Sequence, residues 1–122
     1  MRSKNFKVNV LRNSTLFGFS NTLRLDLVIN IFVYNLINNQ KILIDGGGNQ
    51  YRPFVSISDV CKIYDYLIAS NKLPSFICNL VSFNSKIRDL AYKIIKTLGK
   101  GKNSLKFNDK FFDNRNYIVG SN

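Results

Sequence analysis

The spacing of apolar residues along the chain predicts three helices. Apolar side chains recur at three- and four-residue steps over residues 25–38, 58–69 and 85–98. This period is typical of a helix that buries one face. Ser58 and Ser85 are the predicted N-caps, because a serine hydroxyl accepts a hydrogen bond from a free backbone N–H in the first turn. Gly99 is predicted to end the third helix.

Shorter apolar or alternating runs predict strands between these helices. The predicted strands are Val8–Leu11, Lys41–Ile44, Arg52–Ile57 and Ser75–Ser82, with weaker strand-like runs at Ser104–Phe107 and Asn116–Val119. The run at 75–82 is continuously apolar, which predicts a buried strand. Pro53 is placed near the start of its strand because proline cannot donate to a central ladder. Strands that alternate with helices favour an α/β fold, and 122 residues suffice for one small domain.

Three consecutive glycines, Gly46 to Gly48, separate two of the predicted strands. A dinucleotide-binding loop needs Gly-x-Gly-x-x-Gly between a strand and a helix, so both the spacing and the following strand disagree with that motif. The glycines therefore predict a tight turn that reverses the chain. The turn delivers Arg52 to the start of a strand, where a guanidinium can bind phosphate oxygens in pairs. Taken alone, Arg52 is better explained as an exposed arginine in a salt bridge.

Composition narrows the classes of function. The formal net charge of +11 suggests a polyanionic partner, but the lysines are scattered and no nucleic-acid-binding motif is visible. The absence of histidine removes Ser-His and Cys-His catalytic arrangements and most zinc sites. Cys61 and Cys78 have no metal-like spacing and fit a reduced compartment. We expect a cytoplasmic protein without a membrane span, because no signal peptide or long apolar run is visible.

Three segments together resemble the NAD-dependent epimerase/dehydratase family, the extended short-chain dehydrogenases/reductases that act mostly on nucleotide sugars. They are "VLRNSTLFG" (10–18), "DLVINIFVYNLINNQKILIDGGGNQYRPFVSISDVCKIYDYLI" (26–68) and "FICNLVSFNSKIRDLAYKI" (76–94). The likeness extends from about Val8 to Val119. It implies a partial Rossmann-like fold, formed by the last strands of the parallel sheet and the C-terminal substrate-binding subdomain. It also implies NAD as the cofactor and a nucleotide sugar as the substrate.

The resemblance assigns roles to five residues. It implies that Asn13 and Ser14 lie near the nicotinamide of NAD, and that Thr15 lies near the phosphates of the sugar nucleotide. Arg52 stands where the family binds the substrate diphosphate. Arg115, in "DNRNY", matches a second arginine that often contacts the same phosphates. The chain departs from the family at Asp45, where an aromatic residue usually contacts the nucleotide base.

Two decisive family motifs are not found in the sequence, namely the glycine fingerprint and the catalytic Tyr-x-x-x-Lys pair. Tyr92 and Lys96 have that spacing, but they belong to the substrate side of the family's fold. We therefore assign no catalytic residue and no metal ligand. The resemblance implies that residues 1–122 form a single partial domain without the NAD-binding part, a truncated enzyme that is inactive alone.

Two other interpretations stay open. The chain can be one half of a two-chain enzyme, with the NAD-binding half supplied by a separate polypeptide. The less favoured alternative is a small basic protein that binds nucleic acid, which rests on the net charge and on aromatic residues among lysines.

Overall fold

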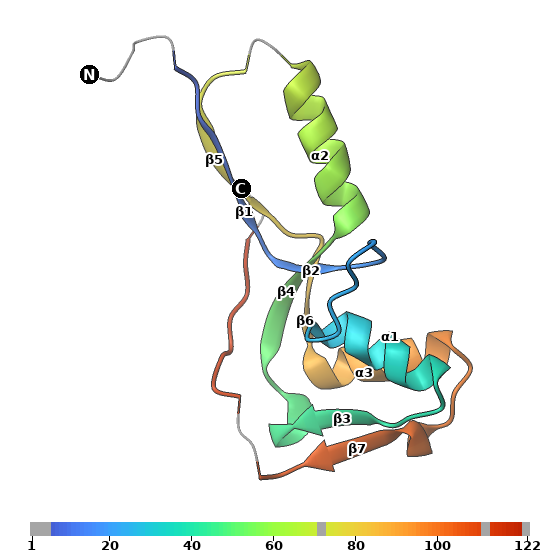
Figure 1. The fold of residues 1–122 in the computed structure, drawn as a ribbon. Helices are drawn as coiled ribbons and strands as arrows, with labels where there is room; N and C mark the ends of the chain where they lie inside the picture. Colours follow the sequence, from blue (N-terminus) through green and yellow to red (C-terminus); the bar gives the residue numbers. More distant parts are fainter. Residues whose placement is uncertain (1–5, 71–72, 111–112, 121–122) are drawn as a thin grey trace.

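The computed structural model describes residues 6–70, 73–110 and 113–120, and over these residues it is a mixed α/β fold (Figure 1). In chain order the elements are β1 (Asn9–Asn13), β2 (Thr15–Phe17), α1 (Val28–Ile37), β3 (Ile42–Asp45), a 3-10 turn (Gly46–Gly48), β4 (Tyr51–Ser56), α2 (Ile57–Ala69), β5 (Phe76–Leu80), β6 (Phe83–Lys86), α3 (Ile87–Thr97), a second 3-10 turn (Lys102–Ser104) and β7 (Leu105–Asn108). The predicted α/β class is confirmed. No helix in the described ranges is long and apolar enough to cross a membrane.

The first sheet pairs β1 with β5 in parallel and carries α2 on one face. Val60 of α2 packs with Leu80, and Leu11 joins the same small core. The opposite face is open, because Val10 and Ile77 stand in register and are 40% and 58% exposed. The prediction that residues 75–82 form a buried strand is therefore wrong for one face. The described part of the chain supplies a covering helix on only one side.

The second sheet has the order β2-β4-β6, with β4 parallel to β2 and antiparallel to β6. Pro53 is fully buried in this central strand, but β2 pairs only from Phe54 onward. Pro53 thus lies outside the residues that pair with β2, so that ladder does not need the N–H that proline lacks. This agrees with the predicted position of Pro53 near the start of its strand. The register of Thr15 against Phe54 brings Thr15 close to Arg52.

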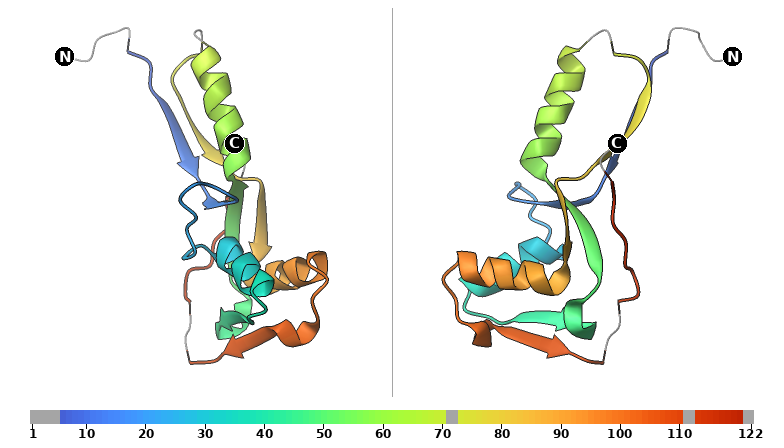
Figure 2. Two further views of the ribbon diagram at one scale, coloured as in Figure 1. Left: turned by 45° about the vertical axis from the view of Figure 1, so that its right-hand side comes forward. Right: turned by 180° about the vertical axis from the view of Figure 1, so that it is seen from behind.

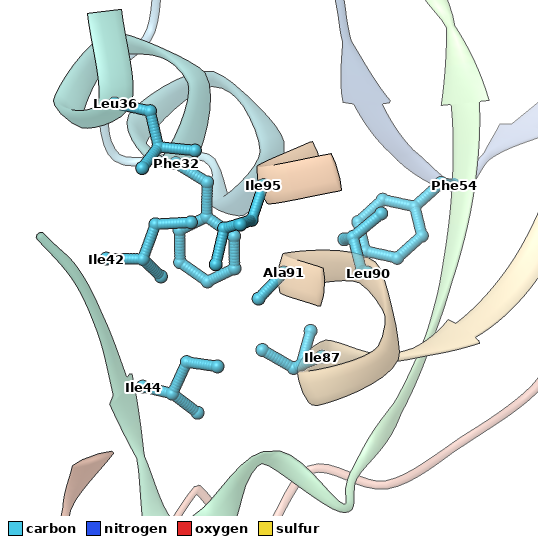
Figure 3. Close-up of a cluster of buried hydrophobic side chains, with 9 residues drawn as sticks. All are labelled: Phe32, Leu36, Ile42, Ile44, Phe54, Ile87, Leu90, Ala91 and Ile95. Carbon is cyan, nitrogen blue, oxygen red and sulfur yellow. The ribbon is translucent and has the colours of Figure 1, made fainter. Parts of the chain in front are cut away.

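The main core lies among α1, α3, β3 and β4 (Figure 3), and these elements are at the opposite end of the molecule from α2 (Figure 2). Side chains from these four elements interdigitate there: Phe32, Leu36, Ile42, Ile44, Phe54, Ile87, Leu90, Ala91 and Ile95. On β3 the alternation is clear, because Ile42 and Ile44 are buried while Leu43 is 52% exposed. β3 pairs with β7 in parallel, which confirms the strand predicted near Ser104–Phe107.

The triple glycine is a turn, as predicted, and its backbone conformation explains why the three residues are glycines. Gly46, Gly47 and Gly48 have φ values of 61°, 71° and 70°, which side chains other than glycine rarely adopt. A Cβ on Gly48 would lie 2.8 Å from Cγ2 of Ile44 and 3.0 Å from the backbone nitrogen of Arg88. The two strands that the turn connects, β3 and β4, belong to different sheets.

Two of the predicted helix caps are wrong. α2 begins directly after β4, so Ser56 is the N-cap and its Oγ accepts from the backbone N–H of Asp59 at 3.1 Å. Ser58 already lies inside the helix. Ser85 belongs to β6, where it stands opposite Arg52, and Lys86 precedes α3 without a side-chain cap. Gly99 follows α3 with φ of 65°, as predicted for the residue that ends the helix.

Residues 113–120, which we call the strap, have no regular secondary structure, so the strand expected at Asn116–Val119 is not formed. The strap runs back past β4 and β6 toward β5 (Figure 1). It carries Arg115 into the neighbourhood of Arg52.

Candidate functional site

A cavity of about 260 Å³, which we call the arginine cavity, opens beside the start of β4. All three residues predicted to bind substrate line it, although they come from β2, β4 and the strap. The lining residues are Thr15, Asp26, Leu27, Val28, Phe32, Leu43, Ile44, Asp45, Gln50, Arg52, Phe54, Ile87, Asp113, Arg115 and Tyr117.

Arg52 is the buried cation of this cavity, with only 8% of its surface exposed. Its Nη1 donates to the backbone oxygen of Tyr51 at 2.9 Å, and its Nη2 donates to Oδ2 of Asp113 at 2.5 Å. The ring of Tyr117 lies 5.5 Å from the guanidinium carbon. A buried charge requires a partner of opposite sign, and Asp113 is that partner.

Asp113 joins the two arginines. Arg115 donates from Nε to Oδ1 of Asp113 at 2.9 Å and from Nη2 to Oδ2 at 3.2 Å, while its own side chain stays 79% exposed. These hydrogen bonds from Arg115 lower the pKa of Asp113 from 3.8 to about 2, with further contributions from Arg52 and against the effect of burial. Asp113 is thus ionised at neutral pH and holds both guanidinium groups.

Two more carboxylates line the arginine cavity, and each has its own partner. Asp26 pairs with Arg24 on the exposed rim, and this contact lowers the pKa of Asp26. Asp45 accepts a hydrogen bond from Nδ2 of Asn108 at 2.9 Å. Asp45 therefore contacts β7 at the position where the family usually has an aromatic residue.

A second cavity, of about 380 Å³, lies next to the first, and we call it the serine cavity. Asn13 and Ser14, predicted near the nicotinamide, line it, and Thr15 and Leu27 line both cavities. Oγ of Ser14 is buried and has no hydrogen-bond partner among the described residues. Asn30 also lines this cavity and connects two other lining residues. Its Oδ1 accepts from Gly18 N at 3.2 Å, and its Nδ2 donates to Arg24 O at 3.0 Å.

The residues present fit one end of NAD. The unpartnered hydroxyl of Ser14 and the neighbouring amide of Asn13 suit a polar edge such as that of nicotinamide. Gly46, Gly47 and Gly48 form the turn after β3 and line neither cavity, so they do not hold a pyrophosphate here. Tyr92 and Lys96 lie exposed on α3 and line neither cavity.

A sequence model of the NAD dependent epimerase/dehydratase family matches residues 1–80. The chain belongs to this family. The match covers Asn13, Thr15 and Arg52 on β1, β2 and β4, and Ser14 between β1 and β2, and it confirms the resemblance found from the sequence.

Solved structures support the same fold. A dTDP-glucose 4,6-dehydratase from Bacillus anthracis in complex with NAD is 22% identical, with a TM-score of 0.74 over 93% of this chain and 36% of that one. A UDP-glucuronic acid 4-epimerase from Bacillus cereus, in complex with UDP-glucuronic acid and NAD, is 23% identical, with a TM-score of 0.70 over 87% and 34%. A UDP-N-acetylglucosamine 4-epimerase from Bacillus cereus is 20% identical, with a TM-score of 0.74 over 88% and 36%.

These likenesses confirm a partial Rossmann-like fold, and the chain spans about a third of the length of the enzymes it matches. A comparison with curated protein sequences found no match.

Proposed function

We propose that this chain binds the diphosphate of a nucleotide sugar in the arginine cavity. The sugar then extends past Thr15 into the serine cavity. The observation that carries the proposal is the meeting of Arg52, Arg115 and Thr15 at one cavity, from segments far apart in the sequence. In this role the chain is the substrate-side portion of an NAD-dependent nucleotide-sugar epimerase or dehydratase.

The chemistry of the cavity suits a diphosphate. A guanidinium carries five N–H donors in a planar fork, and the hydrogen bonds described for Arg52 use two of them. The first turn of α1, which includes Val28, also lines the cavity and has neither an acidic residue nor a side-chain cap. Its free N–H groups and the positive end of the helix dipole favour an anion.

The neighbouring serine cavity supplies polar groups for the rest of the ligand. Leaving the buried hydroxyl of Ser14 unpartnered costs about 1–3 kcal/mol, which a sugar hydroxyl or the nicotinamide edge offsets by hydrogen bonding. NAD supplies the hydride acceptor when it is bound in a complete enzyme of this family. The described residues of this chain bind and orient the substrate. We propose that the chain alone does not convert the substrate to product.

We further propose that an NAD-binding portion, such as a separate polypeptide, packs beside β1. Within the described ranges β1 pairs only with β5, so its other edge is free. Val10 and Ile77 expose apolar surface on the same sheet, and Val8 does so directly before β1. Parallel sheets are normally covered on both faces, so this surface fits the place where an NAD-binding portion packs.

The proposal is tested by titrating UDP and dTDP into the full chain by calorimetry. We expect measurable binding to the wild type and binding weaker by about tenfold or more to Arg52→Gln, because charge-assisted hydrogen bonds contribute about 1.5–3 kcal/mol. Arg12→Gln is the matched control, since Arg12 is exposed on β1 and lines neither cavity. Absence of binding by the wild type, or equal binding by Arg52→Gln, would sink the proposal.

A further inference from the structure

We infer that Asp113 is an internal competitor for the phosphate groups of the ligand, and that it must withdraw from the two arginines before a diphosphate binds. The inference rests on the proposed function and adds Asp113 as a residue that sets the affinity of the arginine cavity for the diphosphate. Asp113 contacts Arg52 through Oδ2 and Arg115 through both carboxylate oxygens. A carboxylate and a phosphate both present paired oxygens to a guanidinium, so the two compete for the same donors.

The charge of the arginine cavity supports this inference. Its lining holds two arginines, Arg52 and Arg115, against three aspartates, Asp26, Asp45 and Asp113. Because Arg24 neutralises Asp26 from the rim, three arginines stand against three aspartates, and an incoming diphosphate meets no net positive charge while Asp113 is in place. Asp26 and Asp45 are held by Arg24 and Asn108, whereas Asp113 is the carboxylate that bonds to both arginines of the cavity. Withdrawal of Asp113 frees N–H donors of Arg52 and Arg115, and it removes a negative charge from the place where the phosphate groups would bind.

The strap that carries Asp113 is held in a way that permits this movement. Oδ1 of Asn116 accepts from Tyr51 N at 2.8 Å, and Tyr117 N donates to Tyr51 O at 3.4 Å. Further along, the amide of Asn84 exchanges two hydrogen bonds of 2.9 Å with the backbone of Val119. Tyr117 and Ile118 are 49% and 68% exposed. Segments held by exposed hydrogen bonds, with few buried apolar contacts, open at low cost.

A purely positioning role for Asp113 makes the opposite prediction. If the carboxylate held both guanidinium groups ready for the ligand, its loss would weaken binding, because the arginines would no longer be aligned. If it competes with the ligand, its loss strengthens binding. The sign of the change therefore separates the two roles.

The experiment compares Asp113→Asn with the wild type in calorimetric titrations with UDP and with inorganic pyrophosphate. We expect the variant to bind both about tenfold more tightly, a coupling typical of linked equilibria. Asp65→Asn is the matched control, because Asp65 is exposed on α2 and its loss changes the net charge equally. Equal or weaker binding by Asp113→Asn, or the same gain in Asp65→Asn, would overturn the inference.

A second pair of variants keeps the inference testable if Asp113→Asn does not fold. Asn116→Ala removes the anchor to Tyr51 without changing any charge, and we expect tighter binding of UDP because the strap yields more easily. Asn114→Ala is the control, because Asn114 is an exposed residue of the strap and its side chain makes none of the strap hydrogen bonds described above. Unchanged binding in Asn116→Ala would contradict the inference.

The outcomes also separate this inference from the proposed function. If the wild type binds UDP through Arg52 but Asp113→Asn and Asn116→Ala bind no better, the proposed function stands and the inference fails. If the wild type and all the variants fail to bind UDP and pyrophosphate, both fail.

Discussion

Asp113 neutralises the buried guanidinium of Arg52 from a position 61 residues further along the chain, with 2.5 Å between Oδ2 and Nη2. The central strand of a sheet thus carries a cation whose counter-charge lies on the strap. Arg115 shares that carboxylate. The placement of the strap therefore decides whether the two arginines of the cavity are paired with Asp113.

This connection predicts a dependence of stability on pH. The pKa of Asp113 is about 2 in the folded chain, below its ordinary value of 3.8, so ionised Asp113 stabilises the folded state. Its contribution is fully present above about pH 5 and is lost as the pH falls from about 4 toward 2. We expect a loss of roughly 1–2 kcal/mol in the free energy of unfolding from this group, after discounting for solvent screening.

Urea unfolding followed by circular dichroism between pH 2 and pH 7 measures this loss. In Asp113→Asn the decline between pH 4 and pH 2 should be shallower than in the wild type, because the titrating group is gone. Asp65→Asn should retain the wild-type slope. Identical slopes in the wild type and Asp113→Asn would show that the ion pair contributes nothing to folding.

A second prediction concerns the glycine turn. Gly48→Ala should destabilise the chain more than Gly99→Ala, although both positions have positive φ. A Cβ at Gly99 meets no atom within 4 Å, so only the backbone conformation, about 1–2 kcal/mol, is at stake. At position 48 a Cβ also collides with Ile44 and with the backbone of Arg88, which adds about 1–3 kcal/mol. Thermal unfolding of both variants checks the difference, and equal losses would contradict the steric argument.

The sequence was sufficient to predict the helices and strands that are marked by a local pattern of apolar residues. The period of apolar residues located α1, α2 and α3, and alternation or apolar runs located β1, β3, β4 and β5. The caps were missed because two strands lead directly into helices. Ser56 is the last residue of β4 and already caps α2, and Ser85 is held in β6 by its pairing with Arg52. No local pattern distinguishes such a serine from one at a helix start.

The candidate site was predictable only in part. The family resemblance named Thr15, Arg52 and Arg115, and the structure brings all three to one cavity. It did not name Asp113, because the need for a counter-ion arises from the burial of Arg52, which is a tertiary property. One signal was present in "DNRNY", where an aspartate two residues before an arginine can bond to it locally.

A third prediction compares two phenylalanines whose rings lie 5.3 Å apart. Phe54 is fully buried in β4, whereas Phe83 on β6 is 37% exposed. Phe54→Ala should cost about 3–5 kcal/mol, because it removes a large side chain from the main core and leaves a cavity. Phe83→Ala should cost about 1 kcal/mol, as is typical of a partly exposed site. Chemical denaturation gives both values, and a larger loss at Phe83 would mean that the core is assigned to the wrong side of β4.

The last prediction concerns the open face of the β1–β5 sheet. Val10 and Ile77 stand in register on the side opposite the small core under α2, and both are exposed. If the NAD-binding portion of a family member covers this face of the sheet, the two side chains become buried. Changing both to glutamate then places two charges in an apolar interface, which is strongly unfavourable.

We therefore expect that Val10→Glu with Ile77→Glu abolishes co-purification of the tagged chain with such an NAD-binding portion, expressed as a separate polypeptide ending before the strand equivalent to β1. UDP binding by the chain alone should persist, because neither residue lines the arginine or the serine cavity. Ile37→Glu, at the exposed end of α1, is the control and should leave co-purification unchanged. If the double variant still co-purifies like the wild type, the partner does not pack on this face, and the free edge of β1 has another explanation.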